Sequence, residues 1–213
     1  FDLKTDLKFT SDYAYDAKGP LEQYLLYKDE RFLLSLIGQR GFDNTLLALY
    51  CLNILNIQID FNKLKAISKV KWPHRFSQLK NSIAPCPVFL SGDHNPEGIK
   101  SFTSIVRYLK YHKIWIIAGI TEGRDPNLLF DPLLDIPLSQ LILTTSPFKG
   151  QTLEDYERLW KHFSTSNCVA IADPKEAFQY AVSQAKTTDL IVVTGSLYLT
   201  GKIEEDFGAG LLS

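Results

Sequence analysis

The fold class is indicated most clearly by the stretch Val88-Phe89-Leu90-Ser91-Gly92-Asp93-His94-Asn95-Pro96, in which a polar loop follows an apolar run. Val88–Leu90 has the length and composition of a short buried strand. Pro96 suits the first position of a helix, and Asn95 suits the cap before it. These residues therefore predict a strand, a polar turn and a helix in succession.

The same alternation continues to the end of the chain. Short apolar strands separated by longer helices are typical of βαβ units, which build a mostly parallel sheet with helices on both faces. Residues 85–213 are therefore expected to form a doubly wound, Rossmann-like α/β domain. Beyond Val88–Leu90, the predicted strands are Ile114–Gly119, Leu141–Thr144, Cys168–Ala172 and Leu190–Val193, and the predicted helices are Pro96–Tyr111, Asp125–Leu134, Thr152–Phe163 and Pro174–Lys186.

The chain before residue 85 has a different pattern. Glu22–Tyr27 and Arg31–Ile37 predict a hairpin, because a short charged turn separates two strand-like runs. Asn44–Leu55 predicts a helix, and Asp60 is a good cap for a second, shorter one. The apolar face of the first helix is predicted to consist of Leu47, Tyr50, Cys51 and Ile54.

The composition describes a folded chain without a dominant charge. The 213 residues are 45% hydrophobic and carry a formal net charge of −1. Such a chain lacks the basic field that attracts nucleic acid or an anionic membrane, and apolar runs such as Ile114–Ile120 are too short to cross a bilayer. We therefore expect no nucleic-acid or membrane partner.

The cysteines and the first residue bear on the redox state of the protein and on whether the chain is a piece of a longer one. Cys51, Cys86 and Cys168 are odd in number and lack metal-ligand or redox spacing. This pattern predicts reduced thiols in an intracellular, cytoplasmic protein, with Cys51 and Cys168 buried as small hydrophobic residues. The chain begins with Phe1 and contains no methionine, so we expect it to be a piece of a longer or processed protein.

Chemistry is expected where the parallel strands end, because ligands of open α/β sheets bind beyond the carboxyl ends of the strands. The richest loop there is Ser91–Pro96, which offers a hydroxyl, a carboxylate, an imidazole and an amide before a helix. A helix N-terminus suits an anion, and His94 can change protonation near neutral pH. The plainer alternative is a helix cap at Asn95. The same two interpretations apply to Ser196, after the last strand: it either binds a ligand or caps the following turn.

Several other kinds of site are not supported, because their motifs are missing. The sequence has no GxSxG elbow, no HExxH and no clustered Cys and His, so neither a hydrolase of that type nor a metal site is predicted. It also has no GxGxxG dinucleotide fingerprint and no GxxxxGK[ST] phosphate loop. The chain alone is therefore expected not to hydrolyse ATP.

Four motifs follow one another along the chain: Leu36-Ile37-Gly38-Gln39 with Asn44 after it, Trp72-Pro73-His74-Arg75-Phe76, Leu90-Ser91-Gly92-Asp93-His94-Asn95-Pro96, and Val193-Thr194-Gly195-Ser196-Leu197-Tyr198. Their order and spacing resemble the second half of the folylpolyglutamate synthase/dihydrofolate synthase family, a branch of the Mur ligase superfamily. The resemblance implies that residues 1–84 are the tail of a central α/β ATPase domain. Residues 85–213 would then be the carboxy-terminal, glutamate-ligase domain.

The resemblance also implies a chemistry, in which ATP activates a folate or dihydropteroate carboxylate and glutamate attacks the resulting acyl phosphate. Asn44 matches an asparagine at the nucleotide base, and Arg75 matches an arginine that contacts the ATP phosphates. His94 and Ser196 match residues near the incoming glutamate. The phosphate loop and the Mg²⁺ ligands would lie upstream of this chain, and the full-length enzyme would be a monomer.

The sequence departs from the family pattern at several positions. Ser91 replaces an aspartate that contacts the nucleotide and Asp93 replaces an alanine, so both are kept as candidate nucleotide-binding residues. His74 replaces a glycine, and Gly123 replaces an aspartate. Two alternatives stay open. One is another Mur-type ligase that acts on a peptidoglycan precursor, and the other is a non-catalytic nucleotide-binding remnant of the fold, suggested by Ser91 and Gly123.

Overall fold

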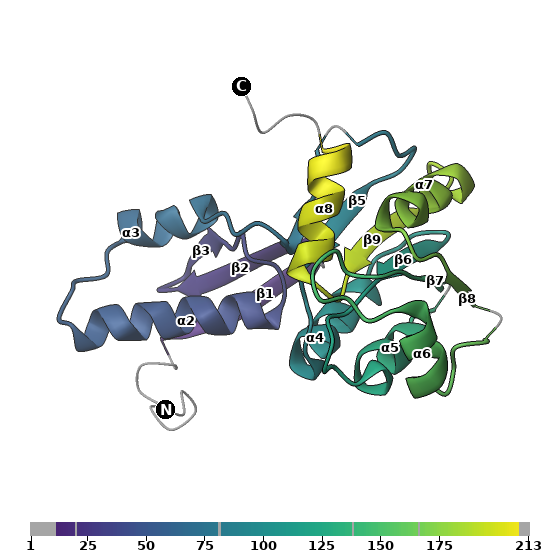
Figure 1. The fold of residues 1–213 in the computed structure, drawn as a ribbon. Coiled ribbons are helices and arrows are strands. Elements are labelled where there is room, and N and C mark those ends of the chain that lie inside the picture. Colours follow the sequence, from purple (N-terminus) through teal and green to yellow (C-terminus); the bar gives the residue numbers. More distant parts are fainter. Residues whose placement is uncertain (1–11, 20, 81, 138, 166, 209–213) are drawn as a thin grey trace. The chain divides into compact units, whose positions relative to one another are not determined.

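The computed structural model describes residues 12–208, apart from residues 20, 81, 138 and 166, and the chain divides into two compact units (Figure 1). The first unit extends to Trp72 and the second begins at Pro73. This division falls before the boundary after residue 84 that the sequence suggested. The reason is strand β4 (Arg75–Gln78), which pairs with strand β5 (Val88–Ser91) and so belongs to the second unit.

The first unit packs helices against a three-stranded antiparallel sheet, and the predicted hairpin is present. Tyr27 pairs with Glu30, so the turn consists of Lys28 and Asp29. Both turn residues have positive φ, at 48° and 63°, which is the conformation that suits a tight two-residue hairpin. The elements are β1 (Tyr13–Gly19), β2 (Glu22–Tyr27), β3 (Glu30–Leu33), α2 (Gln39–Ile54), α3 (Phe61–Ala66) and a 3-10 turn, η1 (Ile67–Lys69).

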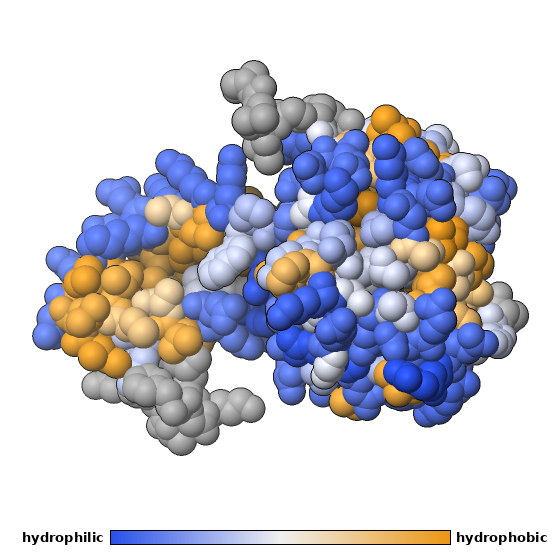
Figure 2. All heavy atoms as spheres, viewed as in Figure 1, coloured by the Kyte–Doolittle hydropathy of each residue, from blue (hydrophilic) through white to orange (hydrophobic). Residues whose placement is uncertain are grey.

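The face predicted for helix α2 was wrong. The helix begins at Gln39 rather than Asn44, and this earlier start brings Phe42 into the face that packs on the sheet together with Leu46 and Leu49. The face predicted from the sequence is largely turned to solvent instead, and Cys51 is exposed. Figure 2 shows the apolar surface that results on the first unit. Its exposed large side chains include Leu47, Ile54, Leu55, Ile57 and Phe61.

The second unit is the predicted Rossmann-like α/β domain. Its six-stranded sheet has the order β4-β5-β9-β6-β7-β8. The pairs from β5 onward are parallel, and β4 is antiparallel to β5 at one edge. The remaining strands are β6 (Ile114–Ala118), β7 (Ser139–Leu143), β8 (Cys168–Ala170) and β9 (Leu190–Thr194), and the helices are α4 (Pro96–Val106), α5 (Pro126–Leu134), α6 (Leu153–Leu159), α7 (Pro174–Gln184) and α8 (Leu197–Phe207).

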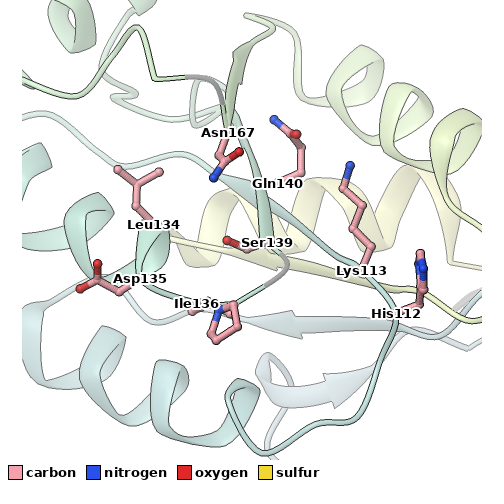
Figure 3. Close-up of a pocket in the computed structure, with 9 residues that line it drawn as sticks. His112, Lys113, Leu134, Asp135, Ile136, Ser139, Gln140 and Asn167 are labelled. Carbon is pink, nitrogen blue, oxygen red and sulfur yellow. The ribbon is translucent and has the colours of Figure 1, made fainter.

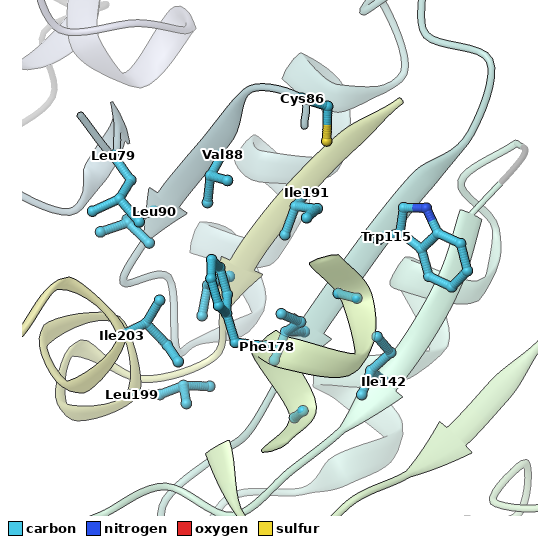
Figure 4. Close-up of a cluster of buried hydrophobic side chains, with 14 residues drawn as sticks. Leu79, Cys86, Val88, Leu90, Trp115, Ile142, Phe178, Ile191, Leu199 and Ile203 are labelled. Atoms are coloured by element: carbon cyan, nitrogen blue, oxygen red, sulfur yellow. The ribbon is translucent and has the colours of Figure 1, made fainter. Parts of the chain in front are cut away.

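Helices cover both faces of this sheet (Figure 1). On one face, Leu90 of β5 and Phe178 of α7 belong to a buried cluster that also includes side chains of α8 (Figure 4). On the other face, the ring of Phe76 stacks on Phe89 at 4.8 Å and lies 6.0 Å from Phe102 of α4. The alternation of Phe89 and Leu90 between the two faces is what a strand buried on both sides requires.

Polar caps fix where the helices of the second unit begin. Asn95, Asp125 and Asp173 each accept a backbone hydrogen bond from the first turn of a helix whose first residue is proline. Thr152 and Asp155 form a reciprocal capping box at the start of α6. The cap at Asn95 is as predicted from the sequence, and the other three helices begin within one residue of their predicted starts.

Candidate functional site

The carboxyl ends of β5, β9 and β6 lie side by side. In the parallel register Ser91 is level with Thr194, and Thr194 is level with Ala118. The loops that follow these strands therefore start at one edge of the sheet, which is where open α/β sheets bind ligands. Residues Ser91–Asn95 and Ser196, singled out from the sequence, both lie at this edge.

Asp93 is the centre of the loop after β5, and its side chain is only 3% exposed. The hydroxyl of Ser91 donates to Asp93 Oδ2 at 2.6 Å, and Arg75 Nη1 lies 3.7 Å from Asp93 Oδ1. The Asp93 carbonyl accepts a hydrogen bond from the Gly195 N–H at 2.9 Å. A buried carboxylate is stable only with such partners. Asp93 therefore links β4, the loop after β5 and the end of β9.

The first turn of α4 also lies against Asp93. A Cβ atom placed on Gly98 would be 2.8 Å from Asp93 Oδ1, so the absence of a side chain there lets the carboxylate approach the helix. Negative charge near a helix N-terminus is favourable. Ser91 and Asp93 thus bond to each other and to other groups of the protein. This arrangement is suited to holding the Arg75 guanidinium in place. Direct contact of either residue with a nucleotide stays a prediction.

His94 lies next to Asp93 and is half-buried. Its Nδ1 is 2.8 Å from the carbonyl oxygen of Gly92. Because a carbonyl can only accept, Nδ1 must carry the proton, and in the neutral ring Nε2 is then an acceptor. The hydrogen bond to Gly92 thus holds the imidazole in one tautomer, with an acceptor at Nε2.

Ser196 is both a cap and part of a buried hydroxyl pair. Its Oγ accepts from the N–H of Tyr198 at the start of α8, at 3.1 Å, so the cap interpretation is confirmed. The same Oγ lies 2.9 Å from Ser146 Oγ, on the loop after β7. The two serines are 2% and 5% exposed. They join the ends of β9 and β7, and any role of Ser196 toward a substrate stays a prediction.

Asn44 belongs to the first unit, where it lies exposed on α2. Arg75, Asp93, His94 and Ser196 all belong to the second unit. The assignment of Asn44 to a nucleotide site therefore stays a prediction from the resemblance.

Two contacts at this edge were not predicted from the sequence. Ser146 lies on the loop after β7, and the sequence analysis did not single it out. His74 Nε2 donates to Glu204 Oε2 of α8 at 2.7 Å. His74 and Glu204 lie 130 positions apart in the sequence, so nothing in the local sequence signals this pair.

A separate hollow of about 490 Å³ opens at the opposite, amino-terminal edge of the sheet (Figure 3). Its position before β6, β7 and β8 is away from the end where the predicted site residues gather. It is lined by His112, Lys113, Leu134, Asp135, Ile136, Pro137, Ser139, Gln140 and Asn167.

Within residues 12–208, gaps excepted, no three His, Cys, Asp or Glu side chains could hold a metal ion together. Among the helices in the same range, none is long and apolar enough to cross a bilayer.

The sequence is similar to those of known ligases. The family model of the Mur ligase, glutamate ligase domain matches residues 74–197. The folylpolyglutamate synthase of Lacticaseibacillus casei is 24% identical over 96% of this chain and 48% of its own length. The UDP-N-acetylmuramoyl-L-alanyl-D-glutamate–2,6-diaminopimelate ligase of Caldanaerobacter subterraneus subsp. tengcongensis is 25% identical over 84% of this chain and 38% of its own length. The chain thus spans about half, or less, of the length of these relatives.

Solved structures share the fold. Mycobacterium tuberculosis folylpolyglutamate synthase complexed with ADP has a TM-score of 0.76 at 18% identity, over 94% of this chain and 49% of that chain. E. coli FolC in complex with DHPP and ADP has a TM-score of 0.72 at 18% identity, over 92% of this chain and 46% of that chain. The family match covers more than half of the chain and runs from His74 to the first residue of α8, so it includes Arg75, Asp93, His94 and Ser196. The chain belongs to the Mur ligase family and carries its glutamate ligase domain.

Proposed function

We propose that this chain is part of an ATP-dependent amide ligase that adds glutamate to the carboxylate of a folate or dihydropteroate compound. The observation that carries the proposal is the position of Arg75. Its guanidinium lies 3.7 Å from the buried carboxylate of Asp93, at the edge where β5 and β9 end, and its side chain is 34% exposed. A partly exposed guanidinium held in place by a buried anion is suited to binding phosphate oxygens.

The reaction has two steps. The substrate carboxylate attacks the terminal phosphorus of ATP, which gives an acyl phosphate and ADP. The amine of glutamate then attacks the acyl carbon, an amide forms, and inorganic phosphate leaves. Mg²⁺, when bound, supplies charge neutralisation at the phosphates, and its ligands are expected outside this chain. Arg75 would stabilise the charge on the transferred phosphoryl group, because its fixed fork of N–H donors matches phosphate geometry.

His94 and Ser196 would orient the incoming glutamate. With Nδ1 bonded to the Gly92 carbonyl, His94 presents an acceptor at Nε2 for the ammonium group or its proton. Ser196 caps α8, and the positive N-terminal end of this helix suits a carboxylate of glutamate. The two residues together would bind both charged ends of an amino acid.

The test is an assay of ATP-dependent glutamate ligation on the natural full-length protein, comparing Arg75→Ala with Arg158→Ala. Arg158 is a matched control because its side chain is 71% exposed and pairs locally with Asp155. We expect Arg75→Ala to reduce kcat/KM for ATP by about 100-fold or more, in line with loss of one charge-stabilising donor. Arg158→Ala should change it less than twofold. Unchanged ligation by Arg75→Ala would refute the proposed role.

A second candidate substrate is a peptidoglycan precursor. The observation that favours it is the similarity to the diaminopimelate-adding ligase of Caldanaerobacter subterraneus subsp. tengcongensis, at 25% identity. Assays with dihydropteroate, tetrahydrofolate and a UDP-muramyl peptide separate the two candidates, since only one class should give ADP and a new amide. Calorimetry with ATP tests the non-catalytic alternative, which requires nucleotide binding without any ligation.

A further inference from the structure

Arg75 stands in an irregular piece of backbone. The pairing of β4 with β5 shifts register between Arg75 and Ser77, so the strand carries a bulge directly after the arginine, at Phe76. The residues on either side, His74 and Phe76, both have positive φ, at 57° and 55°. Bulges re-aim side chains next to active sites, and such a backbone persists only where the surroundings hold it in place.

The side chains of both flanking residues are anchored. Phe76 is 3% exposed and its ring stacks on Phe89 at 4.8 Å. The ring of His74 is bound on α8, where Nε2 donates to Glu204 Oε2 at 2.7 Å. Its Cε1 lies 3.8 Å from the position of a Cβ on Gly201, one turn earlier on the same helix face. The backbone around Arg75 is therefore held from both sides.

The backbone of His74 makes a third connection. Its carbonyl accepts from the N–H of Gly92 at 2.8 Å, and its own N–H donates to Ser77 Oγ at 3.1 Å. His74 thus touches the strand that carries Arg75, the loop that carries Asp93, and the helix that Ser196 caps. All three belong to the second unit.

We propose that His74, clamped to Glu204, is a positioning residue that holds the Arg75 guanidinium at the site where it meets phosphate. Glycine adopts the left-handed conformation of residue 74 without help, because it has no Cβ. Histidine is one of the side chains that enter this region more often than others, and here its ring adds a clamp that glycine cannot supply. The inference rests on the proposed function of Arg75 in ATP binding.

The ligand-free test follows the Arg75 Nε–Hε signal in an ¹H–¹⁵N spectrum of the chain, assigned by its loss in Arg75→Ala. Glu204→Ala removes the acceptor from His74, whereas Glu205→Ala removes the same charge one position along α8 from a side chain that is 74% exposed. We expect Glu204→Ala and His74→Gly to shift the signal and Glu205→Ala to leave it in place. Glu204→Gln, which keeps an oxygen acceptor, should restore a position near that of the wild type.

The functional test measures KM for ATP and kcat for ligation in the natural full-length protein. Glu204→Ala is expected to raise KM for ATP about tenfold while kcat changes less, and to add less than twofold in an Arg75→Ala background, since it acts through that arginine. Thermal unfolding of each variant identifies any that fail to fold. His74→Gly, whose glycine suits the backbone at residue 74, is then the second variant.

The outcomes separate this inference from the proposed function. If Glu204→Ala moves the Arg75 signal no more than Glu205→Ala does, or weakens ATP use equally with and without Arg75, the positioning role is overturned. If the Arg75 signal shifts as expected but Arg75→Ala leaves ATP use unchanged, the clamp stands as a determinant of Arg75 geometry and the proposed function fails.

Discussion

At the scale of single residues, one tight point of the candidate site is Gly195, where the chain leaves the central strand. Its φ is 97°, and a Cβ atom there would lie 2.6 Å from the carbonyl oxygen of Gly119. Both facts concern backbone atoms that cannot move aside without opening the sheet. The geometry of the Ser196–Ser146 pair, which follows directly, therefore depends on this glycine.

Gly195→Ala is expected to destabilise the fold by about 2–4 kcal/mol, because left-handed strain of about 1–2 kcal/mol is joined by a backbone overlap. Gly123→Ala is the matched control, since Gly123 has a φ of 76° but no atom within 4 Å of its Cβ position. Gly123→Ala should lower the free energy of unfolding only by the left-handed strain of about 1–2 kcal/mol. Urea unfolding followed by circular dichroism measures both, and equal losses in the two variants would contradict the account.

The three thiols differ in their surroundings and should differ in reactivity. Cys51 is exposed, whereas burial raises the pKa of Cys86 to about 11 and that of Cys168 to about 12. The thiolate is the reactive form, so at pH 8 Cys51 should react with Ellman's reagent first and the other two only on unfolding. Cys51→Ser should abolish the fast phase. A fast phase that survives in Cys51→Ser would show that one of the other two thiols is accessible.

At the scale of helices and strands, the second unit depends on how its helices begin and how closely they approach the sheet. α4 and α8 each contain a glycine within their helical turns, but in opposite settings. Gly98 lies against Asp93 and Asn95, where a Cβ would be 2.8 Å from an oxygen of each residue, whereas a Cβ on Gly201 would meet only His74 Cε1, at 3.8 Å.

Gly201→Ala should therefore stabilise the protein by about 0.5–1 kcal/mol, the gain of alanine over glycine within a helix. Gly98→Ala should destabilise it, because the new methyl group displaces the carboxylate of Asp93. The two variants make the same chemical change, so the opposite signs in denaturant unfolding test the local packing rather than helix propensity. A shift of the same sign in both would rule out this explanation.

The cap of α5 predicts a dependence on pH. The pKa of Asp125 is held below its ordinary value of 3.8, chiefly because the side chain of Asn127 donates to it, with the Asn127 backbone N–H also contributing. A group whose pKa is lower in the folded state contributes stability above its unfolded pKa, and this stability is lost as pH falls through the folded value. Asp125→Ala should therefore lower the unfolding midpoint at pH 7.

The effect of Asp125→Ala on the midpoint should shrink as the pH is lowered below 3.8, the ordinary pKa of this carboxyl group. A series of urea titrations from pH 7 to pH 2.5 on both proteins measures it. A difference that is constant with pH would mean that the charge of Asp125 plays no part in the cap.

At the scale of the whole molecule, the two units differ in how completely each buries its apolar surface. The second unit has a sheet covered on both faces, with a buried cluster that includes Val88, Ile117, Phe178 and Val193. The first unit has a smaller core and leaves apolar side chains of α2 exposed (Figure 2). Exposed apolar patches of this kind lower solubility when nothing covers them.

Residues 73–213 produced alone should therefore unfold in one cooperative transition. The informative comparison is a version that starts at Pro85, which lacks β4 and so exposes Phe89 and the edge of β5. It should be less stable by several kcal/mol, because one strand and the Phe76 ring are lost. Equal stability of the two versions would favour the boundary after residue 84.

Helix starts and buried parallel strands could be predicted from the sequence because their signals are local. Asn95-Pro96, Asp125-Pro126 and Asp173-Pro174 each combine a cap with a proline, and the strands between them are short apolar runs. Strand β4 was missed because an edge strand reading Arg-Phe-Ser-Gln is short and mostly polar. The face of α2 was misjudged because a helix with apolar residues on two sides has no single preferred phase.

The candidate site was predictable only in part, because only some of its features have local signals in the sequence. Ser91, Asp93, His94 and Ser196 follow apolar strands, so topology alone places them at one edge of the sheet. What holds them could not be read from the sequence, because His74 with Glu204 and Ser146 with Ser196 are contacts between distant segments. The left-handed backbone at Phe76 has no sequence signature, and at His74 the one signal is the glycine that the family pattern has there.

The order of strands has a consequence for the synthesis of this protein. β9 lies between β5 and β6, yet it is the last strand of the sheet to leave the ribosome. Until residues 190–194 emerge, the nascent chain has two apolar strands with unpaired edges, which is the state most open to aggregation and to chaperones. A stop codon shortly before Leu190 would leave the middle of the sheet vacant. Translation of the final strand is therefore the event that lets the domain close.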